Sequence, residues 1–94
     1  MAEYIERRRH SRQPLGAVGV LADDSDPQFR NQLQVLVMNV SVGGLAFRAP
    51  VAFRPGSLYA MRIGTGALHL KARVKIISSR PRTDGAFDIG ANFI

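Results

Sequence analysis

A run of arginines near the start of the chain has the side chains and the spacing to bind an anionic, planar ligand. In Arg7-Arg8-Arg9-His10-Ser11-Arg12, four guanidinium groups lie within six residues. A guanidinium group makes two parallel hydrogen bonds to a phosphate or a purine edge, and it also stacks on flat rings. In an extended chain Arg8 and Arg12 lie about 13 Å apart, and a bend would bring both to one ligand. This run predicts recognition of phosphate and purine groups.

A second polar group, Asn39-Val40-Ser41-Val42-Gly43-Gly44, ends an apolar stretch. Asn39 offers an amide donor and acceptor, and Ser41 offers a hydroxyl. Two residues apart in a strand, they would project from the same face. Gly43 and Gly44 permit a tight turn and a close approach of ligand to backbone. An ordinary strand end before a glycine turn would carry the same residue types, so this group alone leaves both interpretations open.

Catalytic residues are hard to find in the sequence. There is no cysteine, and the two histidines are His10 and His69, the latter on the polar side of an expected strand. No cluster has metal-ligand spacing. The acidic group Asp23, Asp24 and Asp26 resembles the start of a calcium loop but lacks its glycine and distal glutamate, so a solvated turn is expected. These features predict a binding module, not an enzyme, with no catalytic residue, metal site or cofactor.

Composition predicts one domain held together by packing alone. The chain has 94 residues, 46% of them hydrophobic, and without cysteine it has no disulfide. Thirteen Lys and Arg against seven Asp and Glu give a net charge of +6, and eleven of the cations are arginine. Residues 30–82 carry nine cations and no anion. This balance indicates an anionic partner.

The periodicity is that of strands. Apolar and basic residues alternate over Leu68–Ile76, which places His69, Lys71, Arg73 and Lys75 on one face, expected to be a solvated basic surface. Short strands separated by Gly, Pro and Asp turns, without a helical pattern between them, predict an all-β fold, a six-stranded antiparallel β-barrel. The other expected strands are Leu15–Leu21, Leu33–Val40, Leu45–Ala49, Leu58–Ile63 and Phe87–Phe93.

The composition changes at Pro14. Residues 1–13 have almost no apolar content and predict a mobile arginine-rich arm, with a helical turn over Ala2–Arg9 as an alternative, whereas residues 14–94 form the expected barrel. No apolar run approaches the roughly 20 residues that span a bilayer. Arginines also precede any hydrophobic stretch, unlike a secretory signal. A cytoplasmic protein without membrane insertion is expected.

The two polar groups together resemble the signature of the PilZ family. Arg8-x-x-x-Arg12 is followed, after 26 intervening residues, by Asn39-x-Ser41-x-x-Gly44. Gly44-Leu45-Ala46-Phe47 looks like the family's strand after the glycine turn, and Ile89-Gly90-Ala91-Asn92-Phe93-Ile94 looks like its closing strand. The resemblance extends over residues 6–94. Each half of the signature is short, but their order and spacing together are specific.

The resemblance implies a barrel that binds cyclic di-GMP, a bacterial second messenger. Arg8 and Arg12 would grip phosphate and guanine, while Asn39, Ser41 and the Gly44 turn would contact the ligand from the barrel. Bidentate contacts between guanidinium and guanine are worth about 1–3 kcal/mol in DNA recognition. Asn39 stands where the family often has Asp, so the charged acceptor for guanine N1–H and N2–H is lost.

The resemblance also suggests the mechanism and the stoichiometry. In the family an arginine directly before the motif accompanies binding of two stacked ligand molecules, so Arg7, with Arg9, is expected to contact a second one, and Gly43 is a further candidate contact. Ligand would order the arm onto the barrel and create a surface for an unidentified effector protein. No second domain is expected in this chain, so the signal would pass to another protein or through self-association.

Two alternatives stay open. A small basic barrel could bind RNA or single-stranded DNA through cations and exposed aromatic rings. The chain has only five Phe and two Tyr, and Tyr4 is the one aromatic residue expected to be exposed, so nucleic acid is the less favoured partner. The other alternative is a PilZ-like adaptor that binds a protein and no nucleotide.

Overall fold

The computed structural model describes residues 13–65 and 68–94, and their regular elements are all strands. The strands are β1 (Gln13–Asp23), β2 (Leu33–Val40), β3 (Gly44–Ala49), β4 (Leu58–Thr65), β5 (Leu68–Pro81) and β6 (Phe87–Phe93). Within these two ranges no helix is long and apolar enough to cross a membrane.

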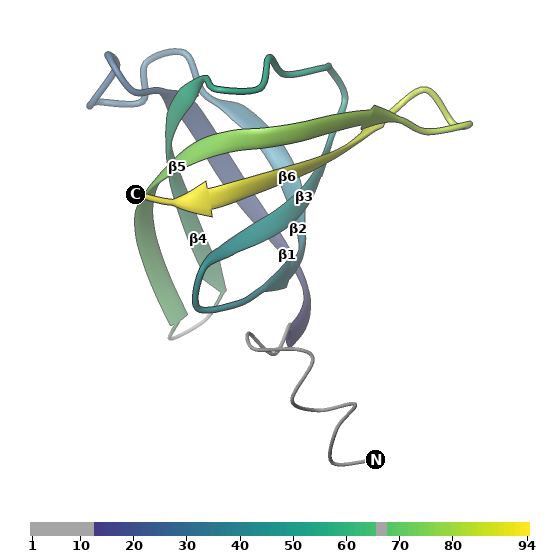
Figure 1. Ribbon diagram of the computed structural model, residues 1–94. Helices are drawn as coiled ribbons and strands as arrows, with labels where there is room; N and C mark the ends of the chain where they lie inside the picture. Colours follow the sequence, from purple (N-terminus) through teal and green to yellow (C-terminus); the bar gives the residue numbers. More distant parts are fainter. Residues whose placement is uncertain (1–12, 66–67) are drawn as a thin grey trace.

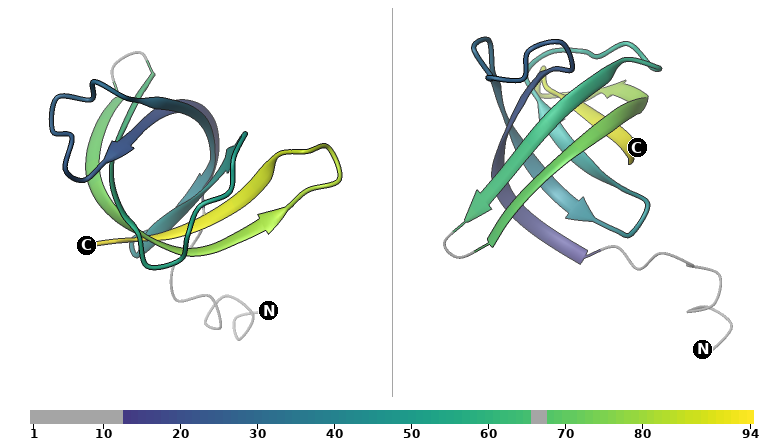
Figure 2. Two further views of the ribbon diagram at one scale, coloured as in Figure 1. Left: turned by 90° about the horizontal axis from the view of Figure 1, so that it is seen from above. Right: turned by 90° about the vertical axis from the view of Figure 1, so that its left-hand side faces the viewer.

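The six strands form a closed barrel in the order β1-β2-β3-β6-β5-β4, and every neighbouring pair is antiparallel. Figure 1 shows the barrel from the side, and the left view of Figure 2 looks down into the ring. The turn between β2 and β3 and the start of β1 lie at the same end of the barrel. The predicted fold class, a six-stranded antiparallel β-barrel, is confirmed.

The interior of the barrel is filled by alternate residues of every strand. On β5, Val74 and Ile76 are buried, whereas Lys71 and Lys75 are exposed, as the alternation predicted. The rings of Phe47, Phe53 and Tyr59 pack edge to face, which is a favoured geometry for aromatic pairs. The largest fully buried side chains are Phe47, Leu21, Met61, Ile63, Ile76, Ile89, Val37 and Val74.

Four strands, β1, β3, β4 and β5, are longer than their patterns predicted, and β5 and β1 extend the furthest. β5 continues to Pro81 because a bulge between Ile76 and Ser78 inserts Ile77, which breaks the alternation without ending the strand. β1 begins at Gln13, a residue that the composition assigned to the arm. The rest of that arm, including the alternative helical turn over Ala2–Arg9, lies outside the described residues.

The acidic loop between β1 and β2 is a turn at the surface whose three carboxylates are hydrogen-bonded. Asp23 accepts two hydrogen bonds from Ser25, and Asp26 accepts two from backbone N–H groups of the same loop. Asp24 forms two hydrogen bonds of 2.9 Å with Arg73, which lies 49 residues further along the chain. The three carboxylates are thus bound to this protein's own donors. A turn at the surface was expected here, and its carboxylates are in addition hydrogen-bonded.

Candidate ligand-binding site

The barrel brings the start of β1 next to the second polar group of the sequence. In the antiparallel pairing of β1 with β2, Gln13 lies opposite Val40 and Pro14 lies opposite Asn39. The chain therefore enters the barrel directly beside Asn39. Arg12 is the residue before Gln13, so the register attaches the arginine-rich segment to this point of the surface.

A bulge in β2 directs Asn39 to the outside of the barrel. The pairing of β2 with β3 shifts register between Val37 and Asn39, so that Val37 and Val40 both face the core although they are three residues apart. Asn39 pairs with Ala46, which lies between the buried residues Leu45 and Phe47 of β3. Directly opposite residues share a face of a sheet, so Asn39 and Ala46 both point outward. Asn39 is half-buried there.

Small residues continue from Asn39 across the outer surface. Ala46 pairs with Gly90 on β6, and Gly90 pairs with Ser78 on β5. A Cβ atom at Gly90 would lie only 2.8 Å from Ser78 Oγ, so the Ser78 hydroxyl lies directly beside Gly90 on this face. We call Ala46, Gly90 and Ser78 the small-residue shelf. It gives Asn39 a flat neighbouring surface without long side chains.

The turn after β2 fixes Ser41 through its own backbone. β2 ends at Val40, so strand periodicity does not place Ser41. Its backbone N–H instead donates to the Gly44 carbonyl oxygen at 2.8 Å, and its hydroxyl donates to the same oxygen at 3.3 Å. The Gly43 carbonyl oxygen accepts a hydrogen bond of 2.9 Å from the Phe93 N–H of β6. The turn is therefore tied to the adjacent strand.

Gly44 is buried where β3 approaches β6 too closely for a side chain. It pairs with Asn92, and an added Cβ atom would overlap the Ala91 carbonyl oxygen and lie 3.0 Å from Asn92 Cα. Both contacts are with backbone atoms, which have little freedom to move. Glycine at this position is required by packing, and it holds the carbonyl group that anchors Ser41.

The family of the chain follows from comparison with known proteins. A family model described as PilZ domain matches residues 6–94. The chain belongs to the PilZ family. Comparison with curated proteins gave no match.

Solved structures show the same fold at low sequence identity. The structure of Bacillus subtilis inhibitor of motility (MotI/DgrA) matches with a TM-score of 0.73 and 13% identity, over 93% of this chain and 42% of that chain. The PilZ domain of YcgR from Escherichia coli with c-di-GMP gives 0.70 and 18%, over 94% and 78%. A crystal structure of YcgR in complex with c-di-GMP gives 0.72 and 16%, over 94% and 38%. This PilZ chain thus spans less than half of MotI/DgrA and of that longer YcgR chain.

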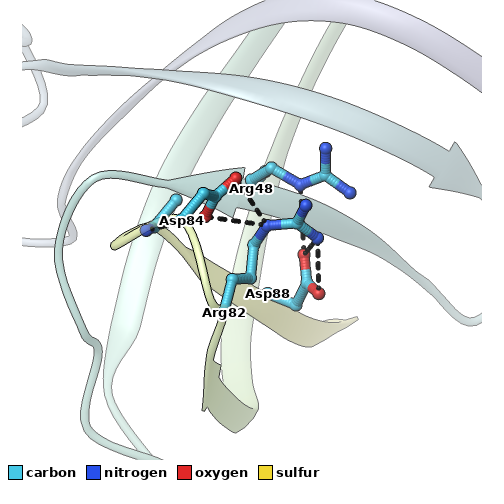
Figure 3. A network of polar contacts seen from close by, with 5 residues as sticks. Arg48, Arg82, Asp84 and Asp88 are labelled. Atoms are coloured by element: carbon cyan, nitrogen blue, oxygen red, sulfur yellow. Dashed lines mark hydrogen bonds and ion pairs between the residues drawn. The ribbon is translucent and has the colours of Figure 1, made fainter.

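The outer surface of this PilZ domain beyond the shelf carries a network of ion pairs (Figure 3). Arg48 and Asp88 lie opposite each other on β3 and β6, two residues further along than Ala46 and Gly90. Arg48 Nε is 3.2 Å from Asp88, and Arg82 Nη1 is 3.1 Å from the same carboxylate. Arg82 also contacts Asp84 at 3.2 Å. Partial burial acts to raise the pKa of Asp88, but the hydrogen bonds from Arg48 and Arg82 outweigh it and lower that pKa.

The paired arginines change how the basic charge of the PilZ domain is interpreted. Arg48, Arg73 and Arg82 all belong to the stretch of nine cations, yet each contacts an aspartate from a distant or neighbouring part of the chain. Arg73 is exposed, as expected, and its hydrogen bonds lower the pKa of Asp24. The stretch from residue 30 to residue 82 is thus less of a free cationic surface than its composition indicated.

Of the predicted site residues, the structure describes one half. Asn39, Ser41, Gly43 and Gly44 lie together, from the end of β2 through the turn to the first residue of β3. Arg7, Arg8, Arg9 and Arg12 lie outside the described residues, as does His10. Over 13–65 and 68–94, no group of three His, Cys, Asp or Glu side chains could hold a metal ion. The small-residue shelf was not found from the sequence, because its members come from three strands whose order the sequence does not state.

Proposed function

We propose that this PilZ protein is a cyclic di-GMP receptor that binds the ligand on the outer surface of the barrel, between the N-terminal arginines and the Asn39–Gly44 turn. Arg8 and Arg12 bind phosphate and guanine, and Asn39, Ser41 and Gly44 form the barrel side of the site. The observation that carries this proposal is the pairing of Pro14 with Asn39, which attaches the arginine segment beside that turn.

The described surface suits a guanine base. A flat ring can lie over the small-residue shelf, while the Asn39 amide lies within the same face and offers both a donor and an acceptor. Arginine adds what the barrel lacks, because its fork pairs with guanine O6 and N7 and binds phosphate with charge-assisted hydrogen bonds. The ligand carries two phosphates and two guanines, so several arginines match its chemistry. The two YcgR structures are complexes with this ligand.

Binding is also the proposed switch. Neutralising Arg8 and Arg12 draws the arginine-rich part of the N-terminal arm, residues 7–12, onto the barrel, and the covered surface then differs from the free one. An effector protein recognises the difference. Arg7 and Arg9 contact a second ligand molecule stacked on the first, with Gly43 as a further contact on the turn. The ordering of the arm reduces the net affinity gained per contact.

Isothermal titration with cyclic di-GMP tests the proposal, with GTP and cyclic di-AMP as control ligands. Arg8→Ala and Arg12→Ala should each weaken binding about 10- to 100-fold, because a hydrogen bond to a charged group contributes roughly 1.5–3 kcal/mol. Arg54→Ala is the matched control. It removes one exposed arginine from the loop between β3 and β4, at the far end of the barrel from the β2–β3 turn, and should titrate as wild type.

Normal titration by Arg12→Ala would overturn the assignment of the site, and the absence of any binding by wild type would support the adaptor that binds no nucleotide. A stoichiometry near two, falling to one in Arg7→Ala, is expected. One ligand per wild-type chain would remove the second molecule from the proposal.

RNA or single-stranded DNA is disfavoured by the described surface. Phe29, Phe47 and Phe53 are buried, so they offer no stacking platform, and three arginines of the basic stretch are paired with aspartates. Affinity for an oligonucleotide would fall steeply between 50 and 200 mM salt if several phosphates were bound. A ligand with two phosphates should show a shallow salt dependence in the same titration.

A further inference from the structure

The barrel seam between β1 and β4 opens towards the end at which the chain enters. The pairs of these strands run from Asp23 with Tyr59 to Gly19 with Ile63. Beyond that point, Val18 still pairs with Leu36 of β2 and Gly64 still pairs with His69 of β5, but the described parts of β1 and β4 no longer pair with each other. The right view of Figure 2 shows β1 and the β4–β5 hairpin diverging there.

A groove of about 520 Å³ lies at this divergence, and we call it the seam groove. Its walls include the apolar side chains of Val18, Val20 and Leu70 and the cationic side chains of Arg62 and Lys71. Val18 is 49% exposed, so a large apolar side chain of the groove wall is left uncovered. The groove thus combines an uncovered apolar surface with two positive charges.

The carboxylates of the barrel are already engaged elsewhere. In the described ranges every aspartate accepts hydrogen bonds from another group, and neither Arg62 nor Lys71 forms an ion pair. The guanidinium carbon of Arg62 lies 4.1 Å from the centre of the Phe29 ring, so Arg62 is held in place by stacking. The two glutamates of the chain, Glu3 and Glu6, are the remaining acidic side chains.

We propose that residues 3–6 of the same chain occupy the seam groove. This segment, Glu3-Tyr4-Ile5-Glu6, has two apolar residues flanked by two acidic ones, which complements an apolar groove with two cations. The length also suffices. The five residues from Gln13 to Val18 span about 17 Å along β1, whereas the eight residues from Ile5 to Gln13 reach up to about 27 Å.

The seam groove and the proposed ligand site lie on opposite edges of β1. The groove is on the edge towards β4, and Asn39 is on the edge towards β2. Contacts of residues 3–6 in the groove are therefore independent of Asn39 and Ser41. The inference does not rest on ligand binding, and its test uses ligand-free protein.

Disulfide trapping tests the inference directly because the chain has no cysteine of its own. The test protein carries Ala2→Cys with Val18→Cys, which leaves residues 3–6 unchanged. The control carries Ala2→Cys with Ile77→Cys, since Ile77 on β5 is 48% exposed and matches Val18. The control position is next to Ser78, which lies four strand spacings, about 19 Å, from Pro14, near the point where the N-terminal segment joins β1. Ala2 can therefore reach the control position as well.

The Val18 pair should form an intramolecular disulfide at least about five times faster than the Ile77 pair, because residence in the groove raises the effective concentration of the two thiols. Equal rates, or a faster Ile77 pair, would overturn the proposal. Disulfide-linked dimers as the main product of the Val18 pair would also overturn it, in favour of a second copy in the groove.

Charge reversal in the Val18 pair tests the chemistry of recognition. Lys71→Glu should slow trapping, and adding Glu6→Lys to that protein should restore the rate, because the pair of charges is then reversed. Lys71 is exposed, so the fold should be retained. Trapping rates that are the same in all three proteins would contradict the role of Glu6 and Lys71.

Discussion

Gly44→Ala tests whether the site turn is held by the close contact of β3 with β6. The added methyl group would overlap the Ala91 carbonyl oxygen and lie 3.0 Å from Asn92 Cα. Relief requires β3 and β6 to separate at their Gly44–Asn92 pair. That movement would also strain the nearby hydrogen bond from the Phe93 N–H to the Gly43 carbonyl oxygen.

The expected loss is large for a single methyl group. Overpacking costs about 1–3 kcal/mol, and loss of one backbone hydrogen bond adds about 1 kcal/mol, which together give roughly 2–4 kcal/mol. A domain of this length is stabilised by only about 5–14 kcal/mol in total. One kcal/mol shifts Tm by about 4–8 °C in a domain of 60–100 residues, so Gly44→Ala should melt about 8–32 °C below wild type.

Thermal unfolding followed by circular dichroism gives the measurement, and Gly90→Ala gives the matched control. A Cβ atom at Gly90 would meet one atom within 4 Å, the Ser78 hydroxyl oxygen at 2.8 Å, which belongs to a side chain that can rotate away. This control should lose less than about 1 kcal/mol, within the usual range for a well-tolerated substitution. A Tm of Gly44→Ala within 2–3 °C of wild type, or equal to that of Gly90→Ala, would refute the argument.

Two further predictions follow from individual side chains. Asn39→Asp should strengthen binding of cyclic di-GMP several-fold in isothermal titration, because a carboxylate is a stronger acceptor for guanine N1–H and N2–H than an amide oxygen; unchanged or weaker binding would show that Asn39 does not accept these bonds. The Arg73 hydrogen bonds keep the folded-state pKa of Asp24 below its unfolded value of about 3.9, so ionised Asp24 stabilises the fold above about pH 4, and this stabilisation is lost as pH falls through the folded-state pKa. Between pH 7 and pH 2.5, Tm should therefore fall less in Asp24→Asn than in wild type, and equal falls would contradict the role of the pair.

The strands were predictable because one side of each faces a dry core. The alternation over Leu68–Ile76 allows only one face of the strand to point to the core, since turning the other face inward would bury three cations. The bounds of β2 and β6 were likewise predicted to the residue, as both end at turn residues or at a change of pattern. Where apolar and polar residues alternate without interruption, local sequence determines the face.

Bulges limited the prediction at two positions, one of which is in the candidate site. Ile77 follows Ile76 directly, and two adjacent apolar residues look like the end of an alternating strand. In β2, Val37 faces the core, so strict alternation would turn Asn39 inward and Val40 outward. The register shift between Val37 and Asn39 reverses both directions. A bulge depends on how the partner strand pairs, and that information is not local.

Charge along the sequence was a poor guide to charge on the surface. Residues 30–82 contain no acidic residue, yet Asp24 reaches Arg73 because β4 brings β1 close to β5. Asp88 reaches Arg48 because β6 pairs with β3. The residues that look most basic in sequence are thus partly neutralised by strands that come from elsewhere in the chain.

The spacing of the two polar motifs has a structural explanation in the β1–β2 hairpin. The 26 residues between Arg12 and Asn39 comprise β1, the loop at the far end and most of β2. Antiparallel pairing returns the chain to its starting point, so that Gln13 lies opposite Val40 whatever the conformation of the loop over residues 24–32. A change in loop length would alter the spacing in sequence but not the pairing of Pro14 with Asn39. The number of residues between the motifs therefore reflects the length of the β1–β2 hairpin. The position of the arginine segment beside Asn39 depends instead on the register in which β1 and β2 pair.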